Sequence, residues 1–428
     1  MLIRLRPHPP PSFQVRHVSS TVTFTAMAVT SRHSHEPSKI GKLKVPILKS
    51  PSHLGHCTNR LRRMYNEDNF SGSLLNIKDS EVFAFTIYDG HGGEQCSSYM
   101  AENLSGIIED LDQLVEDKAK RDELFKNYAK NIGGYWKRWY KNREQHVENW
   151  GKQKIELKNF PADDLSVRVP LAYLDADYKF FGNEEKSGST CTSALIETIY
   201  SKPGTFQPFF ENYFFNRHTI SKLSIAHVGD TRAILVDKEG MAHPLTTDHH
   251  PLDPVEAQRL RRYAANFFMT DSFGEERFIA LANTRAFGDV NYKDVGVTAE
   301  PDFSQYIIGD LAAILEFLTP EEIQKHTIGG LGGDESFIVL CSDGVTNVLT
   351  DQEVADIVLT NVNNRGQKLA TPQWCAQQVI KFVEFVGGDD NATCLVIRLN
   401  GWGRWPNIDR TGELRQARLE DFNPRGER

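Results

Sequence analysis

Short apolar runs that stop at an acidic residue and a glycine are the most regular feature of this chain. Residues 83–88 form one such run and end at Asp89-Gly90, and residues 337–341 form another just before Asp343-Gly344. Apolar runs of this length that end in a turn signal predict buried strands. The other runs that predict strands lie at 192–199, 223–228, 233–236 and 392–398.

Helices are predicted where apolar residues recur at helical spacing, in segments bounded by polar or turn-forming residues. These segments are 95–104, 254–263, 351–358 and 372–386. Many of the strands are joined by turns rather than by crossover helices. The pattern therefore favours an α+β fold, in which sheets pack face to face with helices outside. We expect this domain to start near Leu54 and to end near Leu399.

The stretch from Lys118 to Lys154 differs from its surroundings because Lys and Arg outnumber the acids. Aromatic residues recur there at helical spacing, namely Tyr128, Tyr135, Trp136, Trp139 and Tyr140. An amphipathic helical hairpin within an insert at about 112–160 explains this pattern. The alternative is a docking surface for an acidic partner or a phosphorylated substrate.

The two ends of the chain also have distinct compositions. Arg4, Arg6, Arg16 and Arg32 precede the first acid, among many Ser and Thr residues. This composition is typical of a mitochondrial targeting leader, predicted for residues 1–50, and it favours the matrix as the location. A disordered basic tail on a cytoplasmic protein is the alternative. Residues 400–428 form a charged tail, which Trp402 and Trp405 are expected to anchor to the domain.

Composition and charge exclude several classes of function. The chain has 428 residues, 39% of them hydrophobic, and a formal net charge of −8, which argues against a nucleic-acid binder because such proteins carry a basic face. No apolar run approaches the roughly 18 residues needed to span a bilayer. The six cysteines are scattered without metal-ligand spacing. We expect a monomer.

Four acidic segments carry the candidate chemistry, and all are expected near strand ends. They are Arg63 to Asp68, Asp89 to Gly93, Ser342 to Gly344 and Asp389 to Asn391. Carboxylate and carbonyl oxygens are the ligands that Mg²⁺ and Mn²⁺ prefer. Several carboxylates this close would repel one another unless cations neutralised them. The sequence therefore predicts a metal-assisted hydrolase.

Each acidic segment suggests a role for its residues. Successive side chains of an extended segment point to opposite faces, so Glu67 is predicted to bind metal directly and Asp68 to hold metal-bound water. Asp89 can offer two oxygens, and Gly90 lets its own carbonyl approach an ion. The remaining carboxylates are supplied by Asp343 and Asp390.

Two ions about 3.5–4 Å apart can bridge a water, lower its pKa and bind the oxygens of a displacement at phosphorus. Arg63 suits a phosphate oxygen because its guanidinium can donate two parallel hydrogen bonds. His91 follows Gly90 and is placed to protonate a leaving alkoxide. Direct attack of water, without a phospho-enzyme, is therefore predicted.

These segments give the chain a close resemblance to the metal-dependent protein phosphatase family, the protein phosphatase 2C-like enzymes, over about residues 54 to 399. The matching motifs occur in the family's order, and they are Arg63 with Glu67-Asp68, Asp89 to Gly93, Ser187 to Thr190, Val228 to Arg232, Thr284 to Asp289, Glu300 to Asp302, Ser342 to Gly344 and Asp390-Asn391. The leader suggests a fungal-type mitochondrial member.

The resemblance implies a four-layer α-β-β-α sandwich of two antiparallel sheets flanked by helices. It also implies Mg²⁺- or Mn²⁺-dependent dephosphorylation of Ser and Thr in phosphorylated proteins, with a mitochondrial metabolic enzyme complex as a candidate substrate. By this resemblance Asp89 bridges both ions, Asp343 and Asp390 complete one ion's ligands, and Glu67 serves the other. Asp230 resembles the ligand of a weaker third ion, and residues 253–284 resemble the flap beside the active site.

Some positions depart from the family pattern. Asn347 stands where relatives often have an aspartate, which removes one carboxylate near the second or third ion. A segment at 203–218 is longer than a minimal member needs. Two other functions remain open, a catalytically inactive relative that acts as a scaffold and a hydrolase of small phosphate esters. The presence of Asp89, Asp343 and Asp390 argues against the inactive scaffold.

Overall fold

The computed structural model describes most of the chain. The described residues are 18–27, 40–78, 80–133, 137, 142–160, 162–181, 186–201, 213–264, 268–270, 276–278 and 281–421. Several predicted features lie outside them, among them the four leader arginines, residues 203–212 of the long segment, and Tyr135, Trp136, Trp139 and Tyr140.

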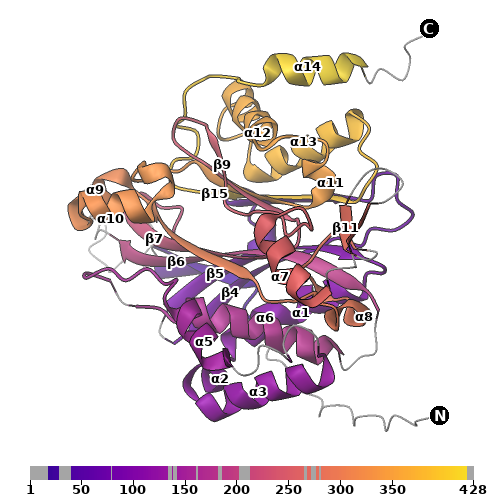
Figure 1. The fold of residues 1–428 in the computed structure, drawn as a ribbon. Helices are drawn as coiled ribbons and strands as arrows, with labels where there is room; N and C mark the ends of the chain where they lie inside the picture. The colour runs from indigo at the N-terminus through magenta and orange to yellow at the C-terminus, as the bar shows by residue number, and fades with distance from the viewer. Residues whose placement is uncertain are drawn as a thin grey trace, which may run out of the picture.

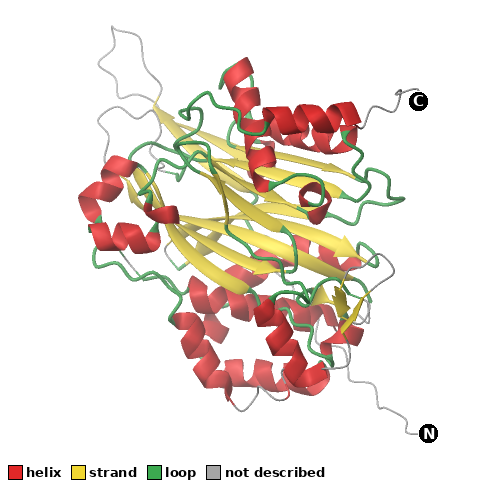
Figure 2. Cartoon of the chain, turned by 45° about the horizontal axis from the view of Figure 1, so that its top comes forward, coloured by secondary structure: helices red, strands yellow, loops and turns green. Residues whose placement is uncertain are grey.

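Two antiparallel sheets packed face to face form the centre of the molecule (Figures 1 and 2). The first sheet has the order β13-β7-β6-β5-β4, with β12 beside β6, and the second has the order β3-β15-β14-β8-β9. The first sheet comprises β4 Asn69–Ile77, β5 Ser80–His91, β6 Gly188–Ser201, β7 Thr219–Val228, β12 Phe287–Gly288 and β13 Asp302–Gly309. The second comprises β3 Leu54–Asn59, β8 Arg232–Val236, β9 Ala242–Pro244, β14 Phe337–Cys341 and β15 Ala392–Arg398.

Helices cover the outer face of each sheet, which confirms the predicted four-layer sandwich (Figure 1). Beside the first sheet lie α1 Gln95–Glu109, α2 Asp112–Glu116, α3 Lys118–Asn131, α5 Arg143–Gly151 and α6 Leu165–Phe181. Beside the second lie α11 Asp343–Thr346, α12 Asp351–Arg365, α13 Pro372–Phe385 and α14 Gly412–Asp421. The remaining helices are α7 Pro254–Ala264, α8 Val290–Lys293, α9 Leu311–Phe317 and α10 Pro320–His326.

The alternation of side chains along β5 explains why that strand is apolar throughout. Phe83 and Phe85 point between the two sheets and join one buried cluster, while Val82 and Ala84 point to the helices and join another. Successive residues of a strand face opposite sides, so a strand buried on both faces loses its polar positions. The apolar run therefore marks a central strand that ends at the acidic turn.

Helix caps in the sequence fix where the outer helices of the second sheet begin. Thr350 accepts a hydrogen bond from the backbone of Glu353, whose carboxylate in turn accepts from the Thr350 backbone. This reciprocal capping box satisfies two backbone donors that would otherwise lack partners. Thr371 caps α13 in the same position, with Pro372 as the first helical residue.

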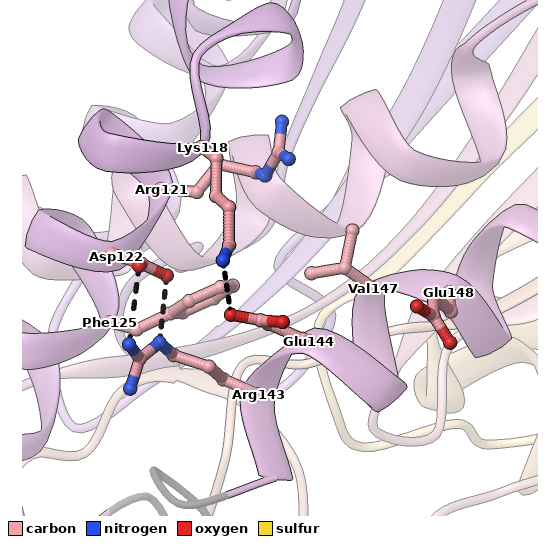
Figure 3. Close-up of a pocket in the computed structure, with 8 residues that line it drawn as sticks. All are labelled: Lys118, Arg121, Asp122, Phe125, Arg143, Glu144, Val147 and Glu148. Atoms are coloured by element: carbon pink, nitrogen blue, oxygen red, sulfur yellow. Dashed lines mark hydrogen bonds and ion pairs between the residues drawn. The ribbon is translucent and has the colours of Figure 1, made fainter.

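The described part of the basic aromatic insert is helical and packs on α6. Phe125, Tyr128 and Trp150 are buried there, in the same apolar cluster as much of α6. A cavity of about 300 Å³ lies between α3 and α5, and Figure 3 shows the side chains that line it. Two of the three cations at this cavity pair with neighbouring acids, Lys118 with Glu144 and Arg143 with Asp122, and Arg121 donates to the backbone carbonyls of α2. This pairing favours a structural role for the insert over a docking site for an acidic partner.

The folded part of the chain extends beyond the predicted boundaries at both ends. Strands β1 (Thr21–Met27) and β2 (Ile40–Pro46) form a hairpin, and Ser19 pairs with Leu74 of β4. Residues N-terminal to Leu54 thus belong to the fold. At the other end, Trp402 and Trp405 pack against Phe337 as expected, and the charged tail contains α14. No helix in the described ranges is long and apolar enough to cross a membrane.

Gly55 tests the packing of α13 on the second sheet. A Cβ atom at Gly55 would lie 2.0 Å from the carbonyl oxygen of Pro372, a backbone atom that cannot move aside alone. We expect Gly55→Ala to lower the free energy of unfolding by about 3 kcal/mol or more, measured by urea denaturation. Gly72→Ala is the matched control in β4, because its nearest neighbour is the flexible Leu48 side chain at 3.0 Å. Equal stabilities of the two variants would contradict this packing.

Candidate active site

A cavity of about 460 Å³ lies where the ends of both sheets meet, and it gathers most of the predicted site residues. The predicted residues that line it are Arg63, Glu67, Asp89, Gly90, His91, Asp230, Asp343 and Asp390. They come from the end of β5, the loop before β4, the β7–β8 turn, and the loops next to β14 and β15. Residues far apart in the sequence therefore meet at one site.

Glycines bring the acidic loops together at backbone contact. A Cβ atom at Gly90 would lie 2.3 Å from the Glu67 carbonyl oxygen, and one at Gly344 would lie 1.9 Å from the Asn391 carbonyl oxygen. Only residues without a side chain fit at such separations. The glycine of each Asp-Gly pair therefore permits the turn and also allows a second loop to approach the backbone closely.

The two central carboxylates carry more negative charge than the protein around them neutralises. Burial, followed by the charges of Asp343 and Asp68, raises the pKa of Asp89 well above its usual value. Burial, followed by the charges of Asp230 and Asp390, raises the pKa of Asp343 to about 7. Such shifts mean that the carboxylates lack compensating positive charge in the protein alone.

Asp68 lies behind these groups and is buried, rather than among the residues that line the cavity. Its Oδ2 accepts hydrogen bonds from Ser342 Oγ at 2.9 Å and Thr393 Oγ1 at 2.7 Å. Its Oδ1 is buried without a hydrogen-bond partner among the described residues. Burial raises the pKa of Asp68 to about 6, although the two hydroxyl hydrogen bonds oppose this shift.

The remaining predicted residues each have a protein partner. Arg63 Nη2 lies 2.5 Å from Asp390 Oδ2, and Glu67 Oε1 accepts a hydrogen bond of 2.6 Å from the Gly93 amide. His91 Nε2 lies 2.8 Å from Asp289 Oδ2. Burial lowers the pKa of His91, but the hydrogen bond and charge of Asp289 outweigh it, so the net shift is upward.

The donor set fits hard divalent cations by its chemistry. It consists of carboxylates and a backbone carbonyl, it contains the buried unpartnered Asp68 Oδ1, and its charge is uncompensated. Within the described ranges, however, no group of three His, Cys, Asp or Glu side chains is already gathered as a ligand set.

The cavity is also lined by residues that were not predicted as metal ligands or catalytic groups. Asn283 Nδ2 donates to Asp230 Oδ2 at 2.8 Å, and Asn347 Nδ2 donates to Asp343 Oδ2 at 3.2 Å. Thr190 lies opposite Asp89 in the β5–β6 register. The motifs Ser187 to Thr190 and Thr284 to Asp289 contained two of the missed residues, Thr190 and Asp289. Asn283 lies within the predicted flap, but no motif singled it out.

The predicted flap at 253–284 is fixed at both of its ends. Glu256 of α7 is buried and accepts hydrogen bonds from Arg285 Nη2 and Arg259 Nη2, each at 2.7 Å, and from Thr284 Oγ1 at 2.6 Å. Burial raises the pKa of Glu256, but Arg285 and Arg259 outweigh it and hold the pKa well below its usual range. Leu281 to Asn283 of this segment line the cavity.

Comparisons with known proteins agree with the geometry. A family model described as Protein phosphatase 2C matches residues 116–315 and 320–391. "Protein phosphatase 2C homolog 4" of Schizosaccharomyces pombe is 34% identical over 404 residues, 91% of either chain. "Protein phosphatase 1K, mitochondrial" of Xenopus laevis is 26% identical over 86% of this chain and 72% of that protein. A crystal structure of a Toxoplasma gondii phosphatase, 18% identical, superposes with a TM-score of 0.50 over 89% of this chain and 96% of that chain, and it supports the fold.

Asp89→Asn tests the repulsion between the buried carboxylates. In a chelator the variant should be more stable than the natural protein by about 1–2 kcal/mol, because a buried charge among like charges is removed while the side-chain oxygen can still accept from the Asp343 amide. Urea denaturation at neutral pH measures this. Asp110→Asn, at the exposed end of α1, is the control and should change stability by less than about 0.5 kcal/mol. A loss of stability in Asp89→Asn would rule out repulsion.

Proposed function

Because the chain belongs to the protein phosphatase 2C family and is therefore a serine/threonine protein phosphatase, we propose that it hydrolyses phosphoserine and phosphothreonine esters in the acidic cavity with two Mg²⁺ or Mn²⁺ ions. The observation that carries this proposal is the meeting of buried, uncompensated carboxylates with Arg63 and His91 in one cavity. A protein that served only as a binding scaffold would have no need for carboxylates that repel one another in this way.

The residues that would hold the ions are those predicted from the sequence. Asp89 with Asp343 and Asp390 would hold one ion, and Asp89 with Glu67 the other. The Gly90 carbonyl would be a further ligand, and Asp230 would serve a weaker third position. Ions of this kind supply positive charge for phosphoryl oxygens and lower the pKa of water, which would attack phosphorus directly. Asp68, with a free buried oxygen and two fixed hydroxyl donors, would orient water beside them.

Arg63 would bind the phosphoryl group. Its side chain is 60% exposed and its guanidinium contacts Asp390 through one nitrogen. A guanidinium can donate several parallel hydrogen bonds to phosphate oxygens. A cation held by Asp390 would neutralise that carboxylate, which would leave the Arg63 guanidinium available for phosphate oxygens.

His91 would protonate the leaving serine or threonine oxygen. It lines the cavity, and Asp289 favours its protonated form. An alkoxide is a poor leaving group, so proton donation matters for natural substrates and matters little for an activated aryl phosphate.

Import into the mitochondrial matrix is the location we propose, with a phosphorylated metabolic enzyme complex as substrate. The basic, Ser- and Thr-rich N-terminus and the relative named as mitochondrial support this proposal. Because residues 18–27 pair with other parts of the fold, the import signal would lie mainly before residue 18.

Asp343→Asn tests the phosphatase proposal. The variant should lose at least about 100-fold in phosphopeptide hydrolysis with Mn²⁺, because a carboxylate ligand is replaced by an amide. Isothermal titration calorimetry should show weaker Mn²⁺ binding, while circular dichroism should show an unchanged fold. Natural activity in this variant would refute the proposed metal centre, and a natural protein without any phosphopeptide hydrolysis would refute the proposed function.

A fluorescent fusion tests the proposed location. Residues 1–50 fused to a fluorescent protein should collect in mitochondria, because their basic, acid-poor composition is that of an import signal. A fusion in which Arg4, Arg6 and Arg16 are replaced by Gln is the matched control and should stay in the cytosol. Cytosolic fluorescence from the natural sequence would reject import.

A further inference from the structure

Asp289 is a buried carboxylate in the left-handed backbone region, directly beside the candidate acid. Its φ and ψ are 48° and 42°, and it is one of five non-glycine residues with positive φ in the described ranges. Its Oδ2 lies 2.8 Å from Nε2 of His91, which is 198 residues away in the sequence. Aspartate and asparagine adopt this conformation more readily than most residues.

A buried network holds the backbone next to Asp289. The Gly288 amide donates to Asp177 Oδ1 at 2.7 Å, and Lys293 Nζ lies 2.9 Å from Asp177 Oδ2. Lys293 also donates to the Ala286 carbonyl at 2.7 Å. Tyr128, from α3 of the insert, donates its hydroxyl to Asp177 as well. The turn that carries Asp289 is therefore fixed by α6, α8 and the insert together.

The side chains of Asp289 and His91 lie against the backbone of Gly188, in the space that a side chain at this position would occupy. A Cβ atom at Gly188 would lie 2.3 Å from His91 Nε2 and 2.6 Å from Asp289 Oδ1. The imidazole is thus confined by backbone on one side and by the carboxylate at one nitrogen. Its other ring nitrogen, Nδ1, has no protein hydrogen bond within the described part of the chain.

We propose that Asp289 is the positioning residue for His91, which it holds through Nε2 so that Nδ1 delivers the proton to the leaving oxygen. This inference rests on the proposed phosphatase function. In the step, water oxygen forms a bond to phosphorus and the phosphorus–ester oxygen bond breaks with its electron pair on the ester oxygen. That oxygen takes the Nδ1 proton and becomes the substrate hydroxyl. The proton that the attacking water releases restores the His91 cation.

Asp289→Asn tests the proposal, because asparagine keeps the left-handed backbone and removes the charge. With Mn²⁺, kcat for a phosphothreonine peptide should fall about 10–100-fold, towards that of His91→Ala, while kcat for 4-nitrophenyl phosphate should change less than about 3-fold. KM for the peptide should stay the same. The double variant should be no slower than His91→Ala alone, since both changes remove one function.

Asp237→Asn is the matched control. Asp237 is also buried, and its Oδ2 also lies 2.8 Å from a histidine, Nε2 of His243, at the β8–β9 end of the second sheet. This variant should leave the ratio of the two kcat values unchanged. Equal losses on both substrates in Asp289→Asn, a gain in activity, or an additive loss in the double variant would each overturn the proposal.

A nitrogen-15 imidazole spectrum separates this inference from the proposed function. In the natural protein, His91 should show a hydrogen-bonded Nε2 proton, and in Asp289→Asn that signal should shift to the position of a weaker hydrogen bond, whatever the activity, because an amide oxygen accepts without the carboxylate's charge. Absence of that signal in the natural protein would overturn the positioning role directly. If the signal is present but His91→Ala slows both substrates equally, the acid role of His91 fails and the positioning proposal fails with it. Inactivity of the natural protein on both substrates would instead refute the phosphatase function.

Discussion

Repulsion between buried carboxylates acts at the point where the two sheets end. Asp68, Asp89 and Asp343 all have raised pKa values, chiefly because burial withdraws water from them. Repulsion of this kind opposes folding and must be outweighed by the apolar clusters between and outside the sheets. The packing of the two sheets therefore holds these carboxylates close together, although their mutual repulsion favours separation.

Neutral side chains hold the acidic loops in place without adding charge. Asn391 accepts from the Glu67 amide at 2.8 Å and donates to the Tyr65 carbonyl at 2.9 Å and the Arg60 carbonyl at 3.2 Å. An amide can donate and accept at once, so one side chain connects the loop that carries Arg63 to the loop that carries Asp390. A lysine at this position would neutralise part of the negative charge of the carboxylates and so lower their affinity for cations.

The sequence predicted those parts of the fold whose pattern is set locally. Strands β5, β14 and β15 can be predicted because burial on both faces leaves an uninterrupted apolar run in the sequence. Helix α6 was missed because it is buried nearly all round, which hides the helical period, and because the buried Arg168 and the internal Pro170 both argue against a helix. Strands β1 and β2 lie within residues 1–50, where the basic composition predicts a leader and hides the strand pattern.

The same distinction applies to the site. Eight of the predicted residues line one cavity, and they could be predicted because each belongs to a short motif with its own chemistry. The role of Asp289, by contrast, depends on a partner 198 residues away in the sequence. The asparagines show a third case. An aspartate at 347 would add a carboxylate beside Asp343, but Asn347 donates a hydrogen bond to it, as Asn283 does to Asp230. Each amide gives its partner carboxylate a hydrogen bond but no positive charge, so burial and the neighbouring acids still raise the pKa of Asp343 to about 7 and the pKa of Asp89 well above its usual value.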